Sequence, residues 1–262
     1  MKIKANGIQM KYELSGREGA EAVMLSHSLG ASLAMWEPQM ESLKAHFLVL
    51  RYDTRGHGGT EAPSGAYTLE QLGDDAVGLL DALRIDVVHW VGLSMGGMIG
   101  QGLALNDPNR LHCLVLSDTA SMVPKEAQPV WQERIDTANN KGMKALVDGT
   151  IENWFTQPYL SANPPELQMI RQQFLATPVS GFVGCSEAIR NLNYLDRLSQ
   201  IEKPTLIMVG EEDPRTPVAA AEAMHARIPN SRLVVLPSAS HLSSVEQSEA
   251  FNSELVTFLK NC

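Results

Sequence analysis

The feature that most constrains the fold of this chain is a series of short apolar segments that alternate with segments of helical periodicity. Each apolar segment is hydrophobic along most of its length rather than at every second position, so both faces of the sheet must be covered. Strands separated by helices in this way are typical of a mostly parallel sheet with helices on both faces, and we expect an α/β fold. The expected strands are residues 22–27 (AVMLSH), 47–53 (FLVLRYD), 87–92 (VVHWVG), 111–118 (LHCLVLSD), 204–210 (PTLIMVG) and 232–237 (RLVVLP).

Local sequence signals predict the first turn and the helices. Asn6-Gly7 lies between residues that alternate in hydropathy, which predicts an N-terminal hairpin with a tight turn. Thr68 is the expected N-cap of a long helix, because Glu70 and Gln71 follow in the first turn and leucines recur at helical spacing. Further helices are expected at residues 35–46, 95–105, 217–228 and about 244–260.

From about Met122 to Asp196 the alternation stops, and the segment contains no convincing strand. It holds the aromatic residues Trp131, Trp154 and Phe155, together with helix-like stretches interrupted by prolines. We expect a helical cap that lies over the ends of the strands. Residues 1–121 and 197–262 then form the core, and residues 122–196 form the cap.

Charge and composition limit the classes of function. A net charge of −9 over 262 residues argues against non-specific binding to nucleic acids, which requires clustered Lys and Arg. No apolar run approaches the length of a membrane span, and the N-terminus lacks the apolar segment of a signal peptide. Cys113, Cys185 and Cys262 form no CxxC pair, which suits a reducing compartment and indicates neither a zinc site nor a disulfide framework. We expect a cytoplasmic protein that acts on a small molecule.

The sequence VGLSMGG (Val91–Gly97) places a serine between glycines where a strand is expected to turn into a helix. In this context a Gly-x-Ser-x-Gly pattern is typical of a nucleophile elbow, a tight turn that exposes the serine hydroxyl. The hydroxyl then lies at a helix N-terminus, where free N–H groups favour developing negative charge. The alternative is a phosphate-binding loop, but the chain contains neither GxGxxG nor GxxxxGK. Ser94 is therefore the candidate nucleophile.

A serine nucleophile needs a base, and the base in turn needs an orienting acid. Three histidines follow Ser94 in the chain. His112 is expected in a strand and His225 within a helix, where a structural or solvent-facing role is the simpler reading. His241 is expected in the loop between the last strand and the last helix, from which it could reach the serine. We predict that His241 is the base.

The orienting acid is expected between Ser94 and the base in chain order. Asp213 lies just past an expected strand end, in a short turn that begins at Gly210. Glu211, Glu212 and Asp118 are alternatives, and Asp118 follows the strand immediately after the nucleophile helix. We favour Asp213.

Two backbone N–H groups are expected to stabilise the negative charge that develops on the substrate oxygen. One follows the nucleophile, at Met95, and the other belongs to the loop after an early strand. The loop SHSLGAS (Ser26–Ser32) fits this place, and Leu29 is the candidate donor.

The segments SHSLGASLAMWEPQ, LRYDTRGHGGTEAP, VGLSMGGMIGQ and VGEEDPRTP with LPSASHLSSVE resemble the α/β-hydrolase family. Together with WQERI, WFTQPY and GCSEAIRNLNYLDRL, they are most similar to the bacterial 3-oxoadipate enol-lactonases of aromatic catabolism. The resemblance implies hydrolysis of 3-oxoadipate enol-lactone through an acyl-enzyme on Ser94, with no metal and no organic cofactor. A broad-specificity carboxylesterase or perhydrolase of the same fold, and a non-enzymatic receptor, are the alternatives.

The implied substrate carries a carboxylate, for which a guanidinium group is the best-suited partner. Arg190 in the cap is our first candidate and Arg134 is the second. Trp131, three residues before Arg134 and on the same helical face, is expected to line the pocket as an apolar wall beside that charge. Arg51 and Arg55 are expected instead to brace the RYDTRGHG loop. His27 replaces the Asn that is usual in the lactonases, and we expect it to line the pocket.

Overall fold

The computed structural model describes all residues from 1 to 262 and contains one eight-stranded sheet with the strand order β1-β2-β4-β3-β5-β6-β7-β8. β1 pairs with β2 and β2 with β4 in antiparallel fashion, and every other pair is parallel. The expected α/β fold with a mostly parallel sheet is confirmed. The strands are β1 (Lys2–Ala5), β2 (Ile8–Gly16), β3 (Ala22–Ser26), β4 (Leu48–Tyr52), β5 (Val88–Leu93), β6 (Leu111–Ser117), β7 (Thr205–Gly210) and β8 (Ser231–Leu236).

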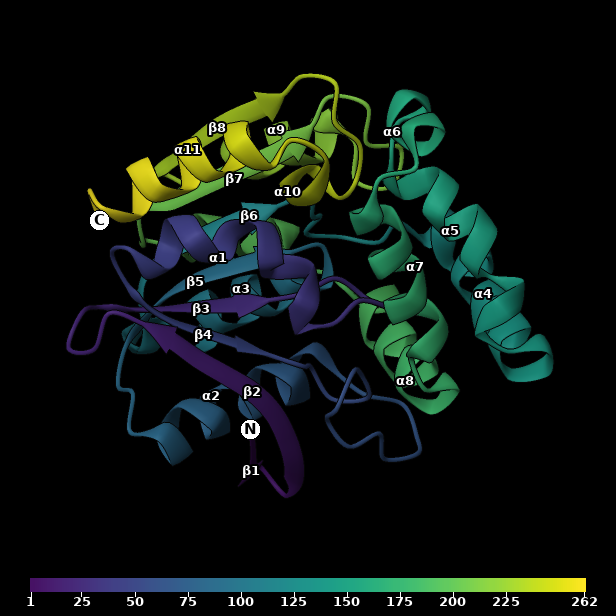
Figure 1. Cartoon of the computed structure of the whole chain (residues 1–262), viewed down its shortest axis with the longest axis horizontal. Helices are drawn as coiled ribbons and strands as arrows, with labels where there is room; N and C mark the ends of the chain where they lie inside the picture. Colours follow the sequence, from purple (N-terminus) through teal and green to yellow (C-terminus); the bar gives the residue numbers. More distant parts are fainter.

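Helices cover both faces of the sheet, which explains why the central strands are apolar throughout. Every residue of β3, β5 and β7 is buried. α1 (Glu37–Lys44) and α11 (Ser248–Leu259) lie in front of the central strands in Figure 1, whereas α3 (Met95–Asn106) lies behind them. The remaining core helices are α2 (Leu69–Leu83), α9 (Val218–His225) and α10 (Ser243–Glu246), with the short 3₁₀ helices η1 (Leu33–Trp36) and η2 (Pro108–Arg110).

Two local predictions hold and one needs correction. Asn6 and Gly7 adopt φ angles of 43° and 82° in the turn between β1 and β2. The side chain of Thr68 caps α2 by accepting a hydrogen bond from the N–H of Gln71. The last helix, expected as one segment, is instead divided into α10 and α11, because Gln247 leaves the helical conformation with φ −121° and ψ 50°.

Between β6 and β7 the chain forms helices and one isolated bridge, Met122 to Asn193, that brings the two ends of the segment together. These helices gather beyond the end of the sheet toward which the parallel strands point (Figure 1). They are η3 (Lys125–Ala127), α4 (Gln128–Lys141), η4 (Met143–Ala145), α5 (Val147–Trp154), α6 (Gln157–Ala162), α7 (Pro165–Ala176) and α8 (Val179–Arg190). After them, η5 (Leu195–Gln200) packs against α3 in the core and leads to β7. The carboxyl ends of the central strands therefore face this helical layer.

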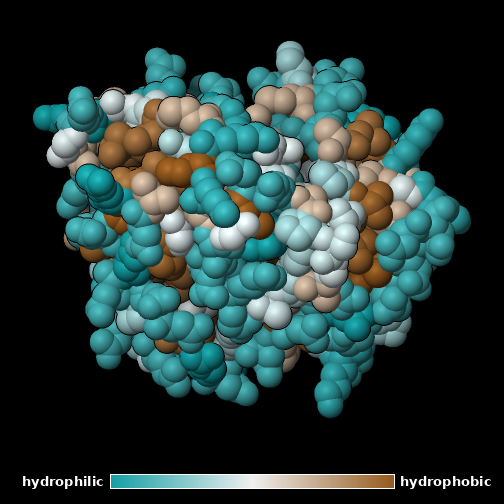
Figure 2. Space-filling model, turned by 90° about the horizontal axis from the view of Figure 1, so that it is seen from below, coloured by the Kyte–Doolittle hydropathy of each residue, from teal (hydrophilic) through white to brown (hydrophobic).

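The surface matches the composition of a chain that keeps its apolar residues inside. Viewed from below, it is mostly hydrophilic, and hydrophobic residues occur in separate groups (Figure 2). None of the helices combines the length and the hydropathy that a membrane span requires.

Candidate active site

Ser94 lies in the turn between β5 and α3, with a φ angle of 54° and a ψ angle of −113°. A positive φ is strained for a residue with a side chain, so the surroundings must hold it in place. The turn is too tight for larger neighbours. A Cβ atom on Gly92 would lie 2.1 Å from the carbonyl oxygen of Gly96, and one on Gly96 would lie 2.1 Å from that of Ser26. The Gly-x-Ser-x-Gly pattern is therefore a steric requirement of this turn.

Hydrogen bonds from three directions fix the strained turn. The N–H of Ser94 donates to the carbonyl of Ser117 on β6 at 2.9 Å. The hydroxyl of Thr119 donates to the carbonyl of Ser94 at 2.7 Å, and the indole N–H of Trp90 donates to the carbonyl of Gly96 at 3.0 Å. These bonds compensate for the unfavourable backbone conformation and hold the hydroxyl in one direction.

The structure brings together the three residues expected to form the reactive group. His241, 147 residues after Ser94, places Nε2 at 3.0 Å from the hydroxyl oxygen of Ser94. Its Nδ1 lies 2.8 Å from Oδ2 of Asp213. All three side chains are almost completely buried. In this arrangement the imidazole can take the serine proton while the carboxylate fixes its tautomer.

Asp213 is held by the turn that follows β7. Its Oδ1 accepts hydrogen bonds from the N–H groups of Arg215 and Thr216, and its Oδ2 accepts one from the hydroxyl of Thr216. Burial by itself would raise the pKa of the Asp213 carboxyl, but His241 and these hydrogen bonds outweigh burial and lower it. The carboxylate is thus kept ionised beside the imidazole.

The alternative acids occupy other places. Asp118 accepts hydrogen bonds from the N–H of Gly210 at 2.8 Å and the hydroxyl of Ser243 at 2.6 Å, and it makes none with His241. Burial, and secondarily the charge of Asp213, raise the pKa of Asp118. Glu211 and Glu212 are exposed. Asp118 therefore belongs to the support of the β7 turn.

Leu29 presents the backbone group that was expected to bind the substrate oxygen. The N–H groups on either side of it are occupied, since Ser28 donates to Sδ of Met35 and Gly30 donates to Nε2 of His57. The N–H of Leu29 has no acceptor within the protein, and Leu29 lines the cavity above Ser94. Met95 is the first residue of α3, where N–H groups have no intrahelical acceptor.

The cavity above Ser94 lies between the core and the cap helices. Arg134 on α4 is its most unusual member, because its Nε is buried without a hydrogen-bond partner and its guanidinium forms no ion pair. Burial, and then the charge of Arg215, lower the pKa of Arg134 to about 10. The cavity is lined by Ser28, Leu29, Ser94, Met98, Trp131, Arg134, Gly149, Thr150, Asn153, Trp154, Ile189, Arg215, Thr216 and His241.

Two expectations about this cavity need correction. Arg190, our first candidate for the carboxylate, does not line it, because its Nε pairs with Glu187 at 2.8 Å and its Nη1 donates to Gln132. His27 does not line it either. Its ring is completely buried, with Nδ1 bonded to the carbonyl of Ser28 and Nε2 accepting from the N–H of Thr54.

Of the other two arginines, Arg55 acts as expected on the RYDTRGHG segment, whereas Arg51 has a different role. Arg55 forms a buried ion pair with Asp75 at 2.6 Å. Arg51 bridges Glu13 and Glu37, each at 2.7 Å. Arg55 thus braces the loop after β4, whereas Arg51 ties β4 to β2 and α1.

Sequence reasoning missed two residues that line the cavity. Arg215 follows Asp213 by two positions, so its side chain is carried to the cavity by the same turn. Trp154 ends α5, and the centre of its ring lies 6.4 Å from that of His241. Trp154 was visible in the segment WFTQPY, but Arg215 had no distinguishing signal.

The fold and the arrangement at Ser94 are those of a hydrolase of the α/β class. The sequence model of the family described as alpha/beta hydrolase fold matches residues 21–248, and this chain belongs to that family.

Within this family, the chain is similar over nearly its whole length to two enol-lactonases and to a putative carbamate hydrolase. The chain is 33% identical to 3-oxoadipate enol-lactonase 2 of Acinetobacter baylyi over 98% of its own length and 96% of that protein. The crystal structure of the enol-lactonase from Burkholderia xenovorans is 38% identical, with a TM-score of 0.96 over 99% of this chain and 100% of that one. A putative carbamate hydrolase, RutD of Caulobacter segnis, is 32% identical over 95% of this chain and 96% of that protein.

Proposed function

We propose that this hydrolase opens 3-oxoadipate enol-lactone to 3-oxoadipate through an acyl-enzyme on Ser94. The observation that carries this proposal is Arg134, which lines the cavity above Ser94 and forms no ion pair, together with the more exposed Arg215, which also lines the cavity. An uncompensated guanidinium in a partly dehydrated cavity is costly, and a substrate carboxylate would supply the missing charge. The similarity to two enol-lactonases supports the same substrate.

The first half-reaction opens the ring. Oγ of Ser94 attacks the lactone carbonyl carbon as Nε2 of His241 takes its proton, and Asp213 stabilises the imidazolium. The N–H groups of Leu29 and Met95 donate to the oxyanion, each worth roughly 3 kcal/mol in such sites. The bond between the carbonyl carbon and the ring oxygen then breaks. His241 returns the proton to the departing enol oxygen, and the enol tautomerises to the ketone.

The second half-reaction releases the acid. A water molecule loses a proton to His241 and attacks the ester carbonyl on Ser94. Collapse of the intermediate breaks the bond to Oγ, which recovers its proton from His241. Throughout, we place the carboxylate arm of the substrate against Arg134 and Arg215. Residues 122–196, as the cap, then select the substrate together with Arg215 of the core, and the core performs the chemistry.

The rings around Arg134 explain how a cap can hold a charge in a partly apolar cavity. Its guanidinium carbon lies 5.7 Å from the centre of the Phe182 ring and 6.0 Å from that of Trp131. Aromatic faces attract a cation without neutralising it. The hydroxyl of Thr150 accepts from Nη2 at 3.4 Å. The group is thereby oriented, and its charge is left available to a ligand.

The test is a change of selectivity in Arg134→Met. We expect kcat/KM for the enol-lactone to fall roughly 30-fold or more, because the substrate carboxylate loses its charged partner. The kcat/KM for p-nitrophenyl acetate, which carries no charge, should change little. Arg190→Met is the matched control, because Arg190 is another cap arginine outside the cavity, and it should leave both constants unchanged. Equal losses on both substrates, or no loss on either, would favour a general carboxylesterase.

A further inference from the structure

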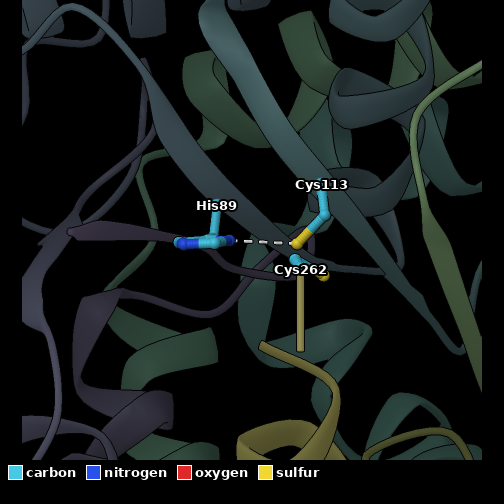
Figure 3. A group of neighbouring side chains, drawn as sticks. All are labelled: His89, Cys113 and Cys262. Atoms are coloured by element: carbon cyan, nitrogen blue, oxygen red, sulfur yellow. Dashed lines mark hydrogen bonds between the residues drawn. The ribbon is translucent and has the colours of Figure 1, made fainter. Parts of the chain in front are cut away.

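A second group of chemically reactive side chains lies at the opposite end of the sheet from Ser94. His89 is on β5, Cys113 is on the neighbouring β6, and Cys262 follows α11. Figure 3 shows the three side chains converging, and their nitrogen and sulfur atoms all lie within 4.8 Å of one another. His89 is on β5 five residues before Ser94, which follows the end of that strand, and this spacing corresponds to roughly 16 Å. The proposed hydrolysis makes no use of this group.

The hydrogen bonds of His89 define which nitrogen is free to act as a ligand. Its Nε2 lies 3.3 Å from Oε2 of Glu21, a carboxylate that can only accept, so Nε2 carries the proton. Its Nδ1 lies 3.1 Å from Sγ of Cys113 and therefore presents a lone pair to the thiol. The proton between nitrogen and sulfur occupies a place that a cation could take.

We propose that His89, Cys113 and Cys262 form a binding site for a thiophilic divalent cation of the Zn²⁺ type. Tetrahedral zinc, with bonds of about 2.1 Å to nitrogen and 2.3 Å to sulfur, places such ligand atoms roughly 3.6–3.8 Å apart. The three ligand atoms, all within 4.8 Å of one another, need to move little to reach this geometry. Because Cys262 is exposed, the fourth position is open to a water molecule.

The surroundings have the features of an outer ligand shell. Glu21 holds the second nitrogen of the imidazole, as carboxylates commonly do for metal-bound histidines. The ring of Phe47 packs edge-on against His89 with centres 5.6 Å apart. Zn²⁺ would replace the thiol protons of Cys113 and Cys262, so the buried site would gain no net charge. Its binding would tie the end of α11 to the middle of the sheet.

These ligands could not be found from cysteine spacing. The residues come from three distant segments, and only the pairing of β5 with β6 and the packing of α11 bring them together. The expectation that the chain lacks a zinc site rested on the absence of CxxC pairs, and the fold supplies a different route to the same donor set.

Titration of the reduced, chelator-treated full chain with Zn²⁺ tests the proposal. We expect one equivalent to bind and the melting temperature to rise roughly 5–10 °C at a free zinc concentration 100-fold above the Kd. Co²⁺ in place of Zn²⁺ should show thiolate-to-metal charge-transfer absorption. Cys262→Ser, at an exposed position, should weaken binding at least about 100-fold, and Glu21→Gln about 10- to 100-fold.

Cys185→Ala is the matched control, because Cys185 is a free cysteine outside the cluster, and it should bind zinc like the parent protein. Unchanged affinity in Cys262→Ser would overturn the proposal. So would a reduced protein that binds no zinc but forms a Cys113–Cys262 disulfide in air. The readouts are binding and stability, so they are independent of the proposed hydrolysis.

Discussion

At the scale of single residues, Ser94, His241 and Asp213 form one chain of hydrogen bonds, and we expect them to act as a unit. Ser94→Ala and His241→Ala should each reduce kcat for an ester substrate roughly 10⁵- to 10⁶-fold, and the double variant should lose little more. The melting temperature of each variant, measured alongside, should stay near that of the parent. Losses that multiply in the double variant would show that the two residues act separately.

Asp213 and Asp118 provide a second prediction at this scale, because both are buried carboxyls near the same turn. Asp213→Asn would place an amide against Nδ1 of His241 and disturb its tautomer, so kcat should fall by roughly 10⁴-fold. Asp118→Asn keeps acceptor capacity for the N–H of Gly210 and should cost less than about tenfold. Steady-state kinetics of the two variants on one ester decides between them. The reverse order would make Asp118 the orienting acid.

At the scale of elements, two buried histidines join the loops that follow β3 and β4. Gly30, next to the proposed oxyanion donor Leu29, donates its N–H to His57, and Thr54 donates to His27. Each histidine accepts through a neutral nitrogen. Burial lowers the pKa of His27 to about 4 and, together with the proximity of His27, lowers that of His57 to about 3. The loop geometry therefore depends on two imidazoles that stay uncharged.

This dependence predicts how stability changes with pH. Histidines in the unfolded chain protonate near pH 6.5, whereas these two stay neutral in the folded chain. Their contribution to the free energy of unfolding is therefore present above pH 6.5 and is lost as pH falls toward 4. The loss approaches about 1.4 kcal/mol per pH unit for each histidine. His57→Gln retains an acceptor for Gly30 without titrating. We expect the free energy of unfolding of His57→Gln, measured by urea unfolding between pH 7 and 4.5, to fall with pH less steeply than that of the parent protein by about that amount. Equal slopes for the two proteins would contradict the assignment.

The cap helices are attached to the element that carries the proposed base. The carboxylate of Glu246 accepts hydrogen bonds from the N–H groups of Ser240, next to His241, and of Thr156 in the cap. Leu242 donates its N–H to the carbonyl of Trp154. The cap, which we propose selects the substrate, is thus linked to the position of the imidazole through these hydrogen bonds.

At the scale of the whole molecule, local patterns predicted the parallel sheet, the elbow and the order of the reactive residues. They did so because apolar strands and a glycine-constrained turn have few structural solutions. The same patterns wrongly placed Arg190 in the cavity, because nothing in the sequence distinguishes it from Arg134 as a cap arginine. The structure shows instead that Arg190 forms an ion pair with Glu187. Arg215 and the group around His89 depend on packing between distant segments. No periodicity or spacing reports such proximity.

The central claim is that Ser94 acts on a lactone whose carboxylate is held by Arg134 and Arg215, the two arginines that line the cavity. The most direct measurement is kcat/KM of the purified protein for 3-oxoadipate enol-lactone and for the same lactone with its carboxylate methylated, with a carbamate as a third substrate. The account predicts that the free acid is preferred by roughly 30-fold or more, from the charge that the arginines recognise. Equal constants for the two lactones, or turnover of the carbamate alone, would contradict it.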